Sequence, residues 1–353
     1  MSISNSIKAF LLRRLTSKKQ SSCPKLIENI IFLRYDRIGD MIISTPVFRE
    51  FKKKFPNANL IVLASSTNKD VIKYNPYVDE IYLNNKKNFL SDLPTLLTLR
   101  RKKIDVAIEF DHSVVPHAIL RLKIIKPKFI VSVQKDGRYG VKGEKLKLYD
   151  HYSNKNDTEH AANRWMKTLE IFDIYHSFQK YDIHIDHLRK KRAKDFCDNL
   201  QSDYLVGFNF EGAVKGKKID FLDFKIISNE LFRTNKKIKF LIFCHPIKYS
   251  FYENKLKNSG IENAHLTYKT ESILDLAAIV RRLSLVISPD TSIVHVASTF
   301  NIPIISVHER NPNSFNLFKP TSKISHTVFS NDTKSLKGYD IDKLIETAKK
   351  ILR

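Results

Sequence analysis

The sequence predicts an α/β protein with two doubly wound parallel sheets, one in each half of the chain. Apolar runs of strand length alternate with helical segments from residue 28 to 133, and a second alternation of the same kind begins at residue 204. Continuous apolar strands separated by helices are typical of parallel sheets that are covered on both faces. With 353 residues, the chain is also long for one hydrophobic core and fits two domains.

In the first half, five apolar runs are predicted to be strands: 28–34, 59–65, 79–84, 104–110 and 128–133. Helices are expected between them, at 45–55, 67–74, 88–102 and 114–123. Residues 134–158 are polar and basic and are predicted to form a long loop, a feature that is often functional. Residues 157–172 are then expected to form a helix that Asp157 or Thr158 caps.

The second half repeats the pattern, with strands predicted at 204–210, 237–243, 264–268, 283–288 and 302–307. Its helices are expected at 221–234, 249–258, 272–282, 291–300 and 340–352. The last helix either stays on this half or packs back on the first. Ligands of such sheets bind at the carboxyl ends of the strands, so the site is expected in a cleft between the halves.

These patterns divide the chain into four parts. We predict a basic amphipathic segment at 1–27, an N-terminal domain at 28–175, a linker at 176–203 and a C-terminal domain at 204–353. The linker is charged and is expected to carry a helix near 187–200.

The net charge of +24 is the most unusual property of the composition. Such an excess favours an anionic partner: a nucleic acid, phospholipid headgroups or a phosphorylated substrate. The alternative is a lysine-rich solvated surface with no partner. We expect no nucleic acid, because the sequence contains no known binding module and no basic motif interleaved with aromatic residues.

The first 20 residues contain five basic side chains and no acidic one. Apolar residues recur there at helical spacing: Ile3, Ile7, Phe10, Leu11 and Leu15. This pattern favours a short helix that lies on a membrane surface, and the alternative is an ordinary helix packed on the domain. No apolar run approaches the ~20 residues that span a bilayer. The three cysteines have neither disulfide nor metal-ligand spacing, which favours the cytosol.

Two junctions between a strand and a helix carry candidate functional residues. In the first, "LRYDRIGDMIISTPVFREF" (33–51), Gly39 and Asp40 follow a buried strand. The glycines of a dinucleotide-binding fingerprint and the Gly-Lys-Ser/Thr of a P-loop are absent. Asp40 at the start of a helix is either a functional carboxylate or a helix cap.

The second junction, "LVISPDTSIVHVAS" (285–298), places Asp290, Thr291 and Ser292 in a turn before a helix. His295 follows Thr291 by four residues and therefore lies on the same helix face. A helix N-terminus with hydroxyl groups suits a pyrophosphate, because free N–H groups and the helix dipole favour anions. The alternatives are an N-cap Asp290 without a ligand and a buried, hydrogen-bonded His295.

A third segment, "FNFEGAVKGKKIDF" (208–221), follows the first strand of the second half. It carries three lysines, and a basic loop at this end of a strand is suited to hold phosphate by charge: Lys215, Lys217 and Lys218. A solvated loop is the alternative.

Together these segments resemble the heptosyltransferase family, the inverting glycosyltransferases that build the inner core of bacterial lipopolysaccharide. The resemblance runs from about residue 28 to 320. It rests on "RIGDMIISTPVFREF", on "EHAANRWMKTLEIF" and on "SILDLAAIVRRLSLVISPDTSIVHVASTFNIPIISV". It implies the GT-B fold, α/β with two Rossmann-like doubly wound domains that face an interdomain cleft. The N-terminal domain is then expected to hold the lipid acceptor and the C-terminal domain ADP-heptose.

The resemblance also implies roles for individual residues. Asp40 takes the position of the general base, and Lys217 that of the lysine that neutralises the leaving diphosphate. The donor is expected to contact the set Asp290, Thr291, Ser292, His295, Lys218 and Glu253, the last by a loose match. We expect the acceptor to contact Arg37, Lys142 and Lys145, since residues 121–147 contain nine basic and two acidic side chains.

The implied reaction needs no cofactor and no metal. A base on the acceptor side and a lysine beside a helix N-terminus at the leaving group suffice. The expected partners are a nucleotide-sugar donor, a lipid A–inner core acceptor and an anionic membrane, and the expected location is the cytoplasmic face of that membrane.

Three departures from the family pattern bear on the substrate. Ser292 replaces a glycine, "KKID" (217–220) lacks the Trp and Pro of Lys-x-Trp-Pro, and "SVHERNPNSF" stands where Phe-Gly-Pro-Thr is usual. They leave open whether Lys217 or Lys218 binds phosphate. Two alternatives therefore remain: a transferase of this fold with another nucleotide sugar or acceptor, and a non-catalytic protein that binds polyanions on a degenerate GT-B scaffold.

Overall fold

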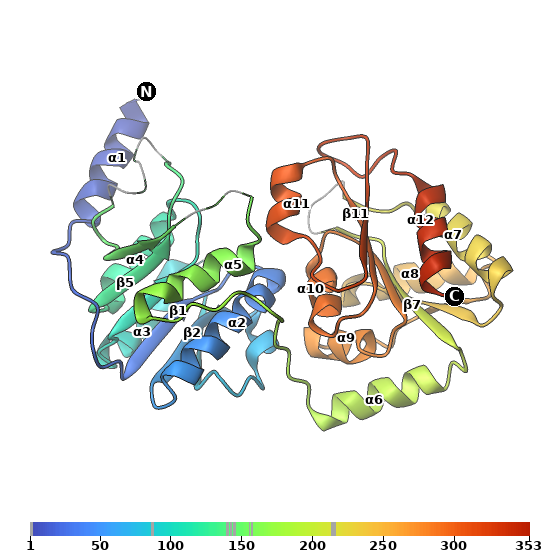
Figure 1. Ribbon diagram of the computed structural model, residues 1–353, viewed down its shortest axis with the longest axis horizontal. Helices are drawn as coiled ribbons and strands as arrows, with labels where there is room; N and C mark the ends of the chain where they lie inside the picture. The colour runs from blue at the N-terminus through green and yellow to red at the C-terminus, as the bar shows by residue number, and fades with distance from the viewer. Residues whose placement is uncertain are drawn as a thin grey trace. The chain divides into compact units, whose positions relative to one another are not determined.

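The computed structural model describes residues 3–85, 88–138, 141, 143, 146–154, 156, 158–212 and 217–353. The chain forms two compact units, Met1–Gln179 and Lys180–Arg353. Each contains one six-stranded sheet with all strands parallel, and helices cover both faces of each sheet (Figure 1). The α/β class predicted from the alternating strands and helices is confirmed.

The first sheet has the strand order β3-β2-β1-β4-β5-β6. Its strands are β1 (Asn29–Leu33), β2 (Asn59–Ser65), β3 (Glu80–Asn84), β4 (Val106–Glu109), β5 (Phe129–Val133) and β6 (His151–Ser153). Its helices are α1 (Ile3–Leu15), α2 (Ile38–Lys54), α3 (Phe89–Arg101), α4 (Pro116–Ile125) and α5 (Ala161–Met166), with 3-10 turns η1 (Lys69–Ile72) and η3 (Lys167–Phe172).

Alternate residues of β1 enter two different cores, as the pleat of a strand requires. Ile31 and Leu33 lie in the core that includes residues of α3 and α4. Phe32 points the other way, against Phe48 of α2, with the ring centroids 4.9 Å apart. Because both faces of the strand are covered, β1 is a continuous apolar run.

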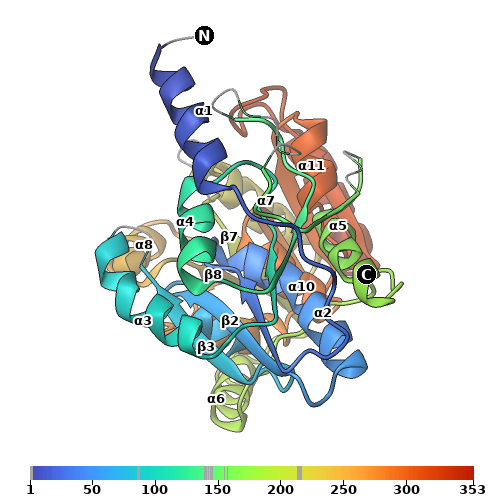
Figure 2. The ribbon, with the colours of Figure 1, turned by 90° about the vertical axis from the view of Figure 1, so that its left-hand side faces the viewer.

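Helix α1 packs beside α4 with one face and leaves its other face open to solvent (Figure 2). Ala9 and Leu12 are buried in the core of the unit, whereas Ile7 and Phe10 are 56% and 62% exposed. The segment is therefore packed on the domain, as the second interpretation expects, and it also presents apolar side chains outward. No helix within the described residues is long and apolar enough to cross a membrane.

The second sheet has the order β12-β11-β10-β7-β8-β9. Its strands are β7 (Tyr204–Asn209), β8 (Ile238–Phe243), β9 (Ala264–Leu266), β10 (Leu285–Pro289), β11 (Ile304–His308) and β12 (Ser325–Phe329). Its helices are α6 (His187–Asp198), α7 (Phe221–Thr234), α8 (Tyr249–Lys257), α9 (Ile273–Val280), α10 (Ser292–Thr299), α11 (Pro312–Phe318) and α12 (Ile341–Ile351), with a 3-10 turn η4 (Pro246–Lys248).

Two helices at the predicted boundaries belong to the C-terminal unit. Helix α6, expected in the linker, packs on α9. The last helix, α12, packs on α7, and its Leu344 and Ile345 lie in the core of that unit. Its apolar face is thus buried within that unit.

Several local predictions were wrong. Helix α2 begins at Ile38 and not near residue 45, because Gly39 and Asp40 form its first turn. His160, rather than Asp157 or Thr158, caps α5: its Nδ1 accepts a hydrogen bond from the Ala162 N–H at 3.1 Å. The predicted long loop contains β6, and α11 and β12 were not predicted.

The strand order reverses between β1 and β4 in the first sheet and between β7 and β10 in the second. At such a switch point the connections leave the sheet in opposite directions, which opens a crevice at the carboxyl ends of the two strands. The residues that follow β1, β4, β7 and β10 are therefore the first place to look for a site.

Gly207, on central strand β7, provides a test of this packing. A Cβ there would lie 2.5 Å from Leu283 Cδ1 and 2.6 Å from Phe243 Cε2. We predict that Gly207→Ala destabilises the protein by roughly 1–3 kcal/mol through overpacking, measured as a lower urea midpoint. Gly260→Ala is the comparison, since Gly260 has a φ of +71° and open surroundings, so that only backbone strain acts there. An unchanged midpoint for Gly207→Ala would contradict the packing described.

Candidate functional site

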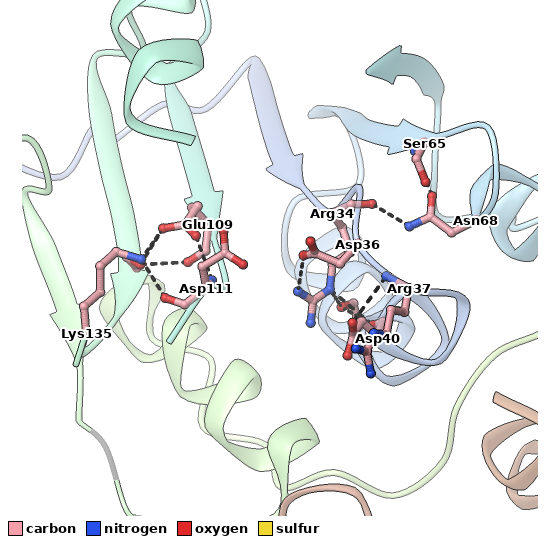
Figure 3. A network of polar contacts seen from close by, with 11 residues as sticks. Arg34, Asp36, Arg37, Asp40, Ser65, Asn68, Glu109, Asp111 and Lys135 are labelled. Atoms are coloured by element: carbon pink, nitrogen blue, oxygen red, sulfur yellow. Dashed lines mark hydrogen bonds and ion pairs between the residues drawn. The ribbon is translucent and has the colours of Figure 1, made fainter. Parts of the chain in front are cut away.

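In the N-terminal unit, the buried side chain of Arg34 joins the end of β1 to the start of α2 (Figure 3). Its Nε donates to the Asp40 carbonyl oxygen at 3.2 Å and to Ser44 Oγ at 2.8 Å, and its Nη1 lies 3.3 Å from Asp36 Oδ2. The guanidinium also lies over the Trp165 ring, 3.8 Å from the centroid. Asp40 is thus held by its backbone, so that its position does not depend on its own carboxylate.

Asp40 is the third residue of α2 and is partly exposed. Its Oδ2 accepts a hydrogen bond from the backbone N–H of Arg37, the N-cap residue, at 3.3 Å. The carboxylate therefore takes part in capping, but not as the N-cap itself. Among the described residues, Arg37 N–H is the single hydrogen-bond donor to this carboxylate, and Oδ1 is left for another partner.

A second cluster, which the sequence analysis did not single out, lies at the ends of β4 and β5 (Figure 3). Lys135 donates to Glu109 Oε2 and, at 2.6 Å, to the Asp111 carbonyl oxygen. The Asp111 N–H donates to Glu109 Oε1 at 2.7 Å, and Ser132 Oγ lies 3.1 Å from Glu109 Oε2. Glu109 and Lys135 are both buried.

The cluster holds its two carboxyl groups in different protonation states. Burial raises the pKa of Asp111 to about 9, together with the negative charges of Glu109 and Asp36. Burial acts in the same direction on Glu109, but the charge of Lys135 and the hydrogen bonds from Asp111 lower its pKa below the ordinary value. At neutral pH Asp111 is thus a neutral acid that can donate a hydrogen bond.

The sequence did contain a signal for this cluster. Asp111 directly follows the strand "IDVAIEF", and Lys135 follows "KFIVSV" by one residue. Polar residues immediately after two neighbouring parallel strands meet at one edge of the sheet. Of the predicted acceptor residues, Arg37 lies at this edge, whereas Lys142 and Lys145 lie outside the described residues.

In the C-terminal unit, the turn between β10 and α10 is built as predicted around a helix N-terminus. Thr291 is the N-cap, and its Oγ1 accepts from the Ile293 N–H at 3.3 Å. Asn209 at the end of β7 donates to Ser288 Oγ at 3.1 Å, which ties the ends of the two strands together. Ser292 is the first residue of the helix.

Asp290 precedes the cap and faces His308 rather than the helix. Its Oδ2 lies 3.6 Å from His308 Nε2. Burial acts to raise the pKa of Asp290, but His308, His295 and Lys217 lower it below the ordinary value. For His308, burial acts to lower the pKa, and the contacts with Asp290 and Glu309 raise it above the ordinary value. His295 is buried one turn into α10.

Lys217 acts electrostatically on Asp290, and its backbone is joined to Gly212, which follows β7. The Gly212 N–H donates to the Lys217 carbonyl oxygen at 2.5 Å, and a Cβ on Gly212 would lie 2.3 Å from that oxygen. Lys217 Nζ donates to Glu309 Oε1, just beyond the end of β11. Lys218 is exposed and lies 3.7 Å from Asp220. Lys217, and not Lys218, is thus the lysine whose charge lowers the pKa of Asp290.

A pocket of about 510 Å³ opens next to the same loop. Its walls include Phe210, Glu211, Phe251, Tyr252, Lys248 and Lys255. Tyr252 stacks on Phe210 with the centroids 5.1 Å apart and donates to Glu211 Oε1 at 3.1 Å. Glu253, expected to contact the donor, is on α8 but does not line this pocket. Within the described ranges, no three His, Cys, Asp or Glu residues are grouped to hold a metal ion.

The raised pKa of Asp111 predicts a pH-dependent stability. The folded protein keeps a proton on Asp111 up to about pH 9, whereas the unfolded chain loses it near pH 3.8. Stability from this group is therefore complete below the unfolded pKa and falls progressively as pH rises from there to the folded pKa, where its loss is complete. We predict that Asp111→Asn, which mimics the neutral acid, gains stability relative to wild type between pH 5 and pH 8, measured as the urea midpoint.

Asp105→Asn is the matched control in the same unit. Burial opposes ionisation of Asp105, but hydrogen bonds from Lys128 and from the N–H groups of Asn29 and Glu28 lower its pKa. The stability that it contributes is present above the unfolded pKa, so this variant is expected to be less stable than wild type at pH 8. If the difference in urea midpoint between Asp111→Asn and wild type is the same at pH 5 and at pH 8, a protonated Asp111 in the folded protein is ruled out.

Comparisons with known proteins agree with this fold. A family model for glycosyltransferase family 9 (heptosyltransferase) matches residues 96–346. A solved family 9 glycosyl transferase from Veillonella parvula is 19% identical with a TM-score of 0.78, covering 94% of this chain and 99% of that one. Escherichia coli heptosyltransferase II is 14% identical with a TM-score of 0.72, covering 92% and 98%.

A third similar structure is the Escherichia coli heptosyltransferase WaaC, solved with ADP. It is 13% identical with a TM-score of 0.72, covering 92% of this chain and 99% of that one. WaaC has also been solved with ADP-2-deoxy-2-fluoro heptose. At these identities the structures establish the GT-B fold, while the family model spans most of the chain. With its two parallel sheets and their two switch points, this protein belongs to glycosyltransferase family 9, the heptosyltransferase family.

Proposed function

We propose that this glycosyltransferase moves a heptose from ADP-heptose to the inner core of a lipopolysaccharide or lipooligosaccharide acceptor, with inversion and without a metal. The observation that carries the proposal is that Lys217, paired with Glu309 after β11, acts electrostatically on Asp290, the residue before the N-cap of α10. WaaC, a similar structure, binds ADP and a fluorinated ADP-heptose.

The α10 turn is suited to the diphosphate of the donor. The first N–H groups of a helix have no partner within the helix and carry the positive end of its dipole. Lys217 adds a formal positive charge that acts on Asp290, the residue before the N-cap. As the bond between sugar and phosphate breaks, negative charge grows on the leaving ADP, and these groups stabilise it in place of a metal ion.

The edge of the first sheet is suited to the acceptor. Among the described residues, the Asp40 carboxylate has one hydrogen-bond donor, so that its other oxygen can accept a proton from the acceptor. A general base requires such an oxygen. Asp111 and Glu109 are hydrogen-bonded to each other and are poorly placed to take a proton. In the proposed reaction, Asp40 removes the proton of the acceptor hydroxyl as its oxygen attacks the anomeric carbon. ADP leaves from the opposite face.

The outward face of α1 supports the proposal that the protein acts at an anionic membrane, on its cytoplasmic side. Ile7 and Phe10 are exposed there, and Arg13 and Arg14 occupy the last turn. Together with the net charge of +24, this surface combines apolar insertion with electrostatic attraction to lipid headgroups.

A second candidate keeps the fold and the chemistry but changes the donor sugar. Ser292 stands where the family pattern has a glycine, at the first position of α10. Its Cβ occupies space next to the proposed diphosphate position, which favours a donor sugar of different shape. A panel of nucleotide sugars separates this candidate from the first.

The base assignment is tested by the release of ADP from ADP-heptose with purified inner-core lipid as acceptor. We predict that Asp40→Ala lowers kcat by at least ~10²-fold, because a positioned base contributes about 10²–10⁴ in rate. The control is Asp36→Asn at the same edge, which keeps shape and is expected to lose less. If Asp40→Ala keeps full activity, the base lies elsewhere. If wild type releases no nucleotide from any nucleotide sugar of the panel, the alternative of a non-catalytic polyanion-binding protein gains support.

The membrane assignment is tested by co-sedimentation with phosphatidylglycerol vesicles. We predict that Ile7→Ser with Phe10→Ser weakens binding at least about tenfold, since burying one such side chain contributes roughly 1.5–3 kcal/mol. Leu188→Ser with Ile324→Ser removes exposed apolar side chains from the other unit and is the matched control. Equal binding by both double variants would contradict a role for α1.

A further inference from the structure

The partner of Lys217 is a carboxylate in an unusual position. Glu309 directly follows β11, next to β10 in the sheet, and is only 2% exposed. Its Oε1 accepts from Lys217 Nζ. Its Oε2 lies 3.4 Å from His308 Nδ1 and, within the part of the chain that the structure describes, accepts no hydrogen bond. Burying a carboxylate oxygen without a hydrogen bond lowers the free energy of unfolding, so the presence of Glu309 at this position calls for an explanation.

The charges around Lys217 nearly cancel before any ligand binds. Lys217 contributes one positive charge and Glu309 one negative charge, in direct contact. Asp290 and His308 form a second pair of opposite charge beside them when His308 is protonated. The α10 turn therefore offers the diphosphate its N–H groups and a lysine whose charge is already offset.

Breaking the contact between Lys217 and Glu309 would leave a buried carboxylate without its counter-charge, which is strongly unfavourable. An ammonium group has three donors, however, and the side chain of Lys217 is 16% exposed. It can therefore donate to a diphosphate without leaving Glu309. In that arrangement the diphosphate binds close to a fixed negative charge.

We propose that Glu309 acts as a counter-charge that weakens the binding of the diphosphate group to Lys217 and the α10 turn. The inference rests on the proposed function, in which ADP and its sugar ester occupy this turn. Its benefit is product release: ADP carries more negative charge than the donor, so a nearby carboxylate weakens the hold on ADP more than the hold on the donor. Release of product is often the slow step of an enzyme. Glu309 belongs to the segment that departs from the family pattern, so it would be a feature of this chain.

The test compares the affinities of ADP and AMP by isothermal titration calorimetry. Glu309→Gln keeps the shape and an acceptor for Lys217 but removes the charge. We expect it to bind ADP at least about tenfold more tightly than wild type, because a unit charge within a few ångströms acts through a low effective dielectric constant. AMP lacks the second phosphate, and its affinity is expected to change much less.

Two further variants serve as controls for this result. Lys217→Met is expected to weaken ADP binding, since it removes the attractive charge. Glu230→Gln removes the same charge from α7, where Glu230 pairs with Arg233, and is expected to leave both affinities as in wild type. If Glu309→Gln does not fold by circular dichroism, Glu309→Met, which is also uncharged and similar in volume, carries the same expectation.

The outcomes separate the inference from the function on which it rests. If wild type binds neither ADP nor AMP, the donor assignment fails. If wild type binds ADP and Lys217→Met weakens it, but the uncharged Glu309 variants bind ADP no more tightly than wild type, the donor site stands and the counter-charge is overturned. Tighter ADP binding with little change for AMP supports the counter-charge, because a merely structural role of Glu309 would not improve affinity.

Discussion

Parallel pairing of a central strand with two neighbours is the constraint on which the rest of this structure depends. β1 pairs with β2 and β4, and β7 pairs with β8 and β10. Each pairing requires a crossover helix, and at the reversal of strand order the helices diverge. The carboxyl ends of the two strands are left open there, so polar residues collect at two edges: Asp40 and Asp111 at one, Lys217 and Asp290 at the other.

Both edges use buried pairs of opposite charge. Lys135 with Glu109 and Lys217 with Glu309 are each held by residues that follow different strands. Taking two charges out of water costs about as much free energy as their attraction returns, so such pairs are weak evidence for stability. Their effect is to fix the position and the charge of the groups beside them. At the first edge, Glu109 helps keep Asp111 protonated, and at the second, Glu309 offsets the charge of Lys217.

The sequence predicted the regular elements where hydrophobic pattern alone decides them. The strand at 59–65 and the helix at 221–234 were predicted with the bounds that the structure has, because the first is a continuous apolar run and the second has clear turn residues at both ends. β12 was missed because its sequence, SHTVF, is an edge strand with half-exposed positions and no apolar run. The early start of α2 was missed because its first turn is held by Arg34, a contact from the end of another element.

Local sequence thus determined the two α/β halves, the positions of the polar turns after β1 and β10, and the motif that resembles the heptosyltransferases. These follow from periodicity and turn chemistry over a few residues. Only the tertiary structure decided which side chains meet. Lys217 and Glu309 are 92 residues apart, and Arg121 on α4 forms an ion pair with Asp92 on α3. Such pairs depend on the order of strands and the packing of helices, so no local pattern in the sequence specifies them.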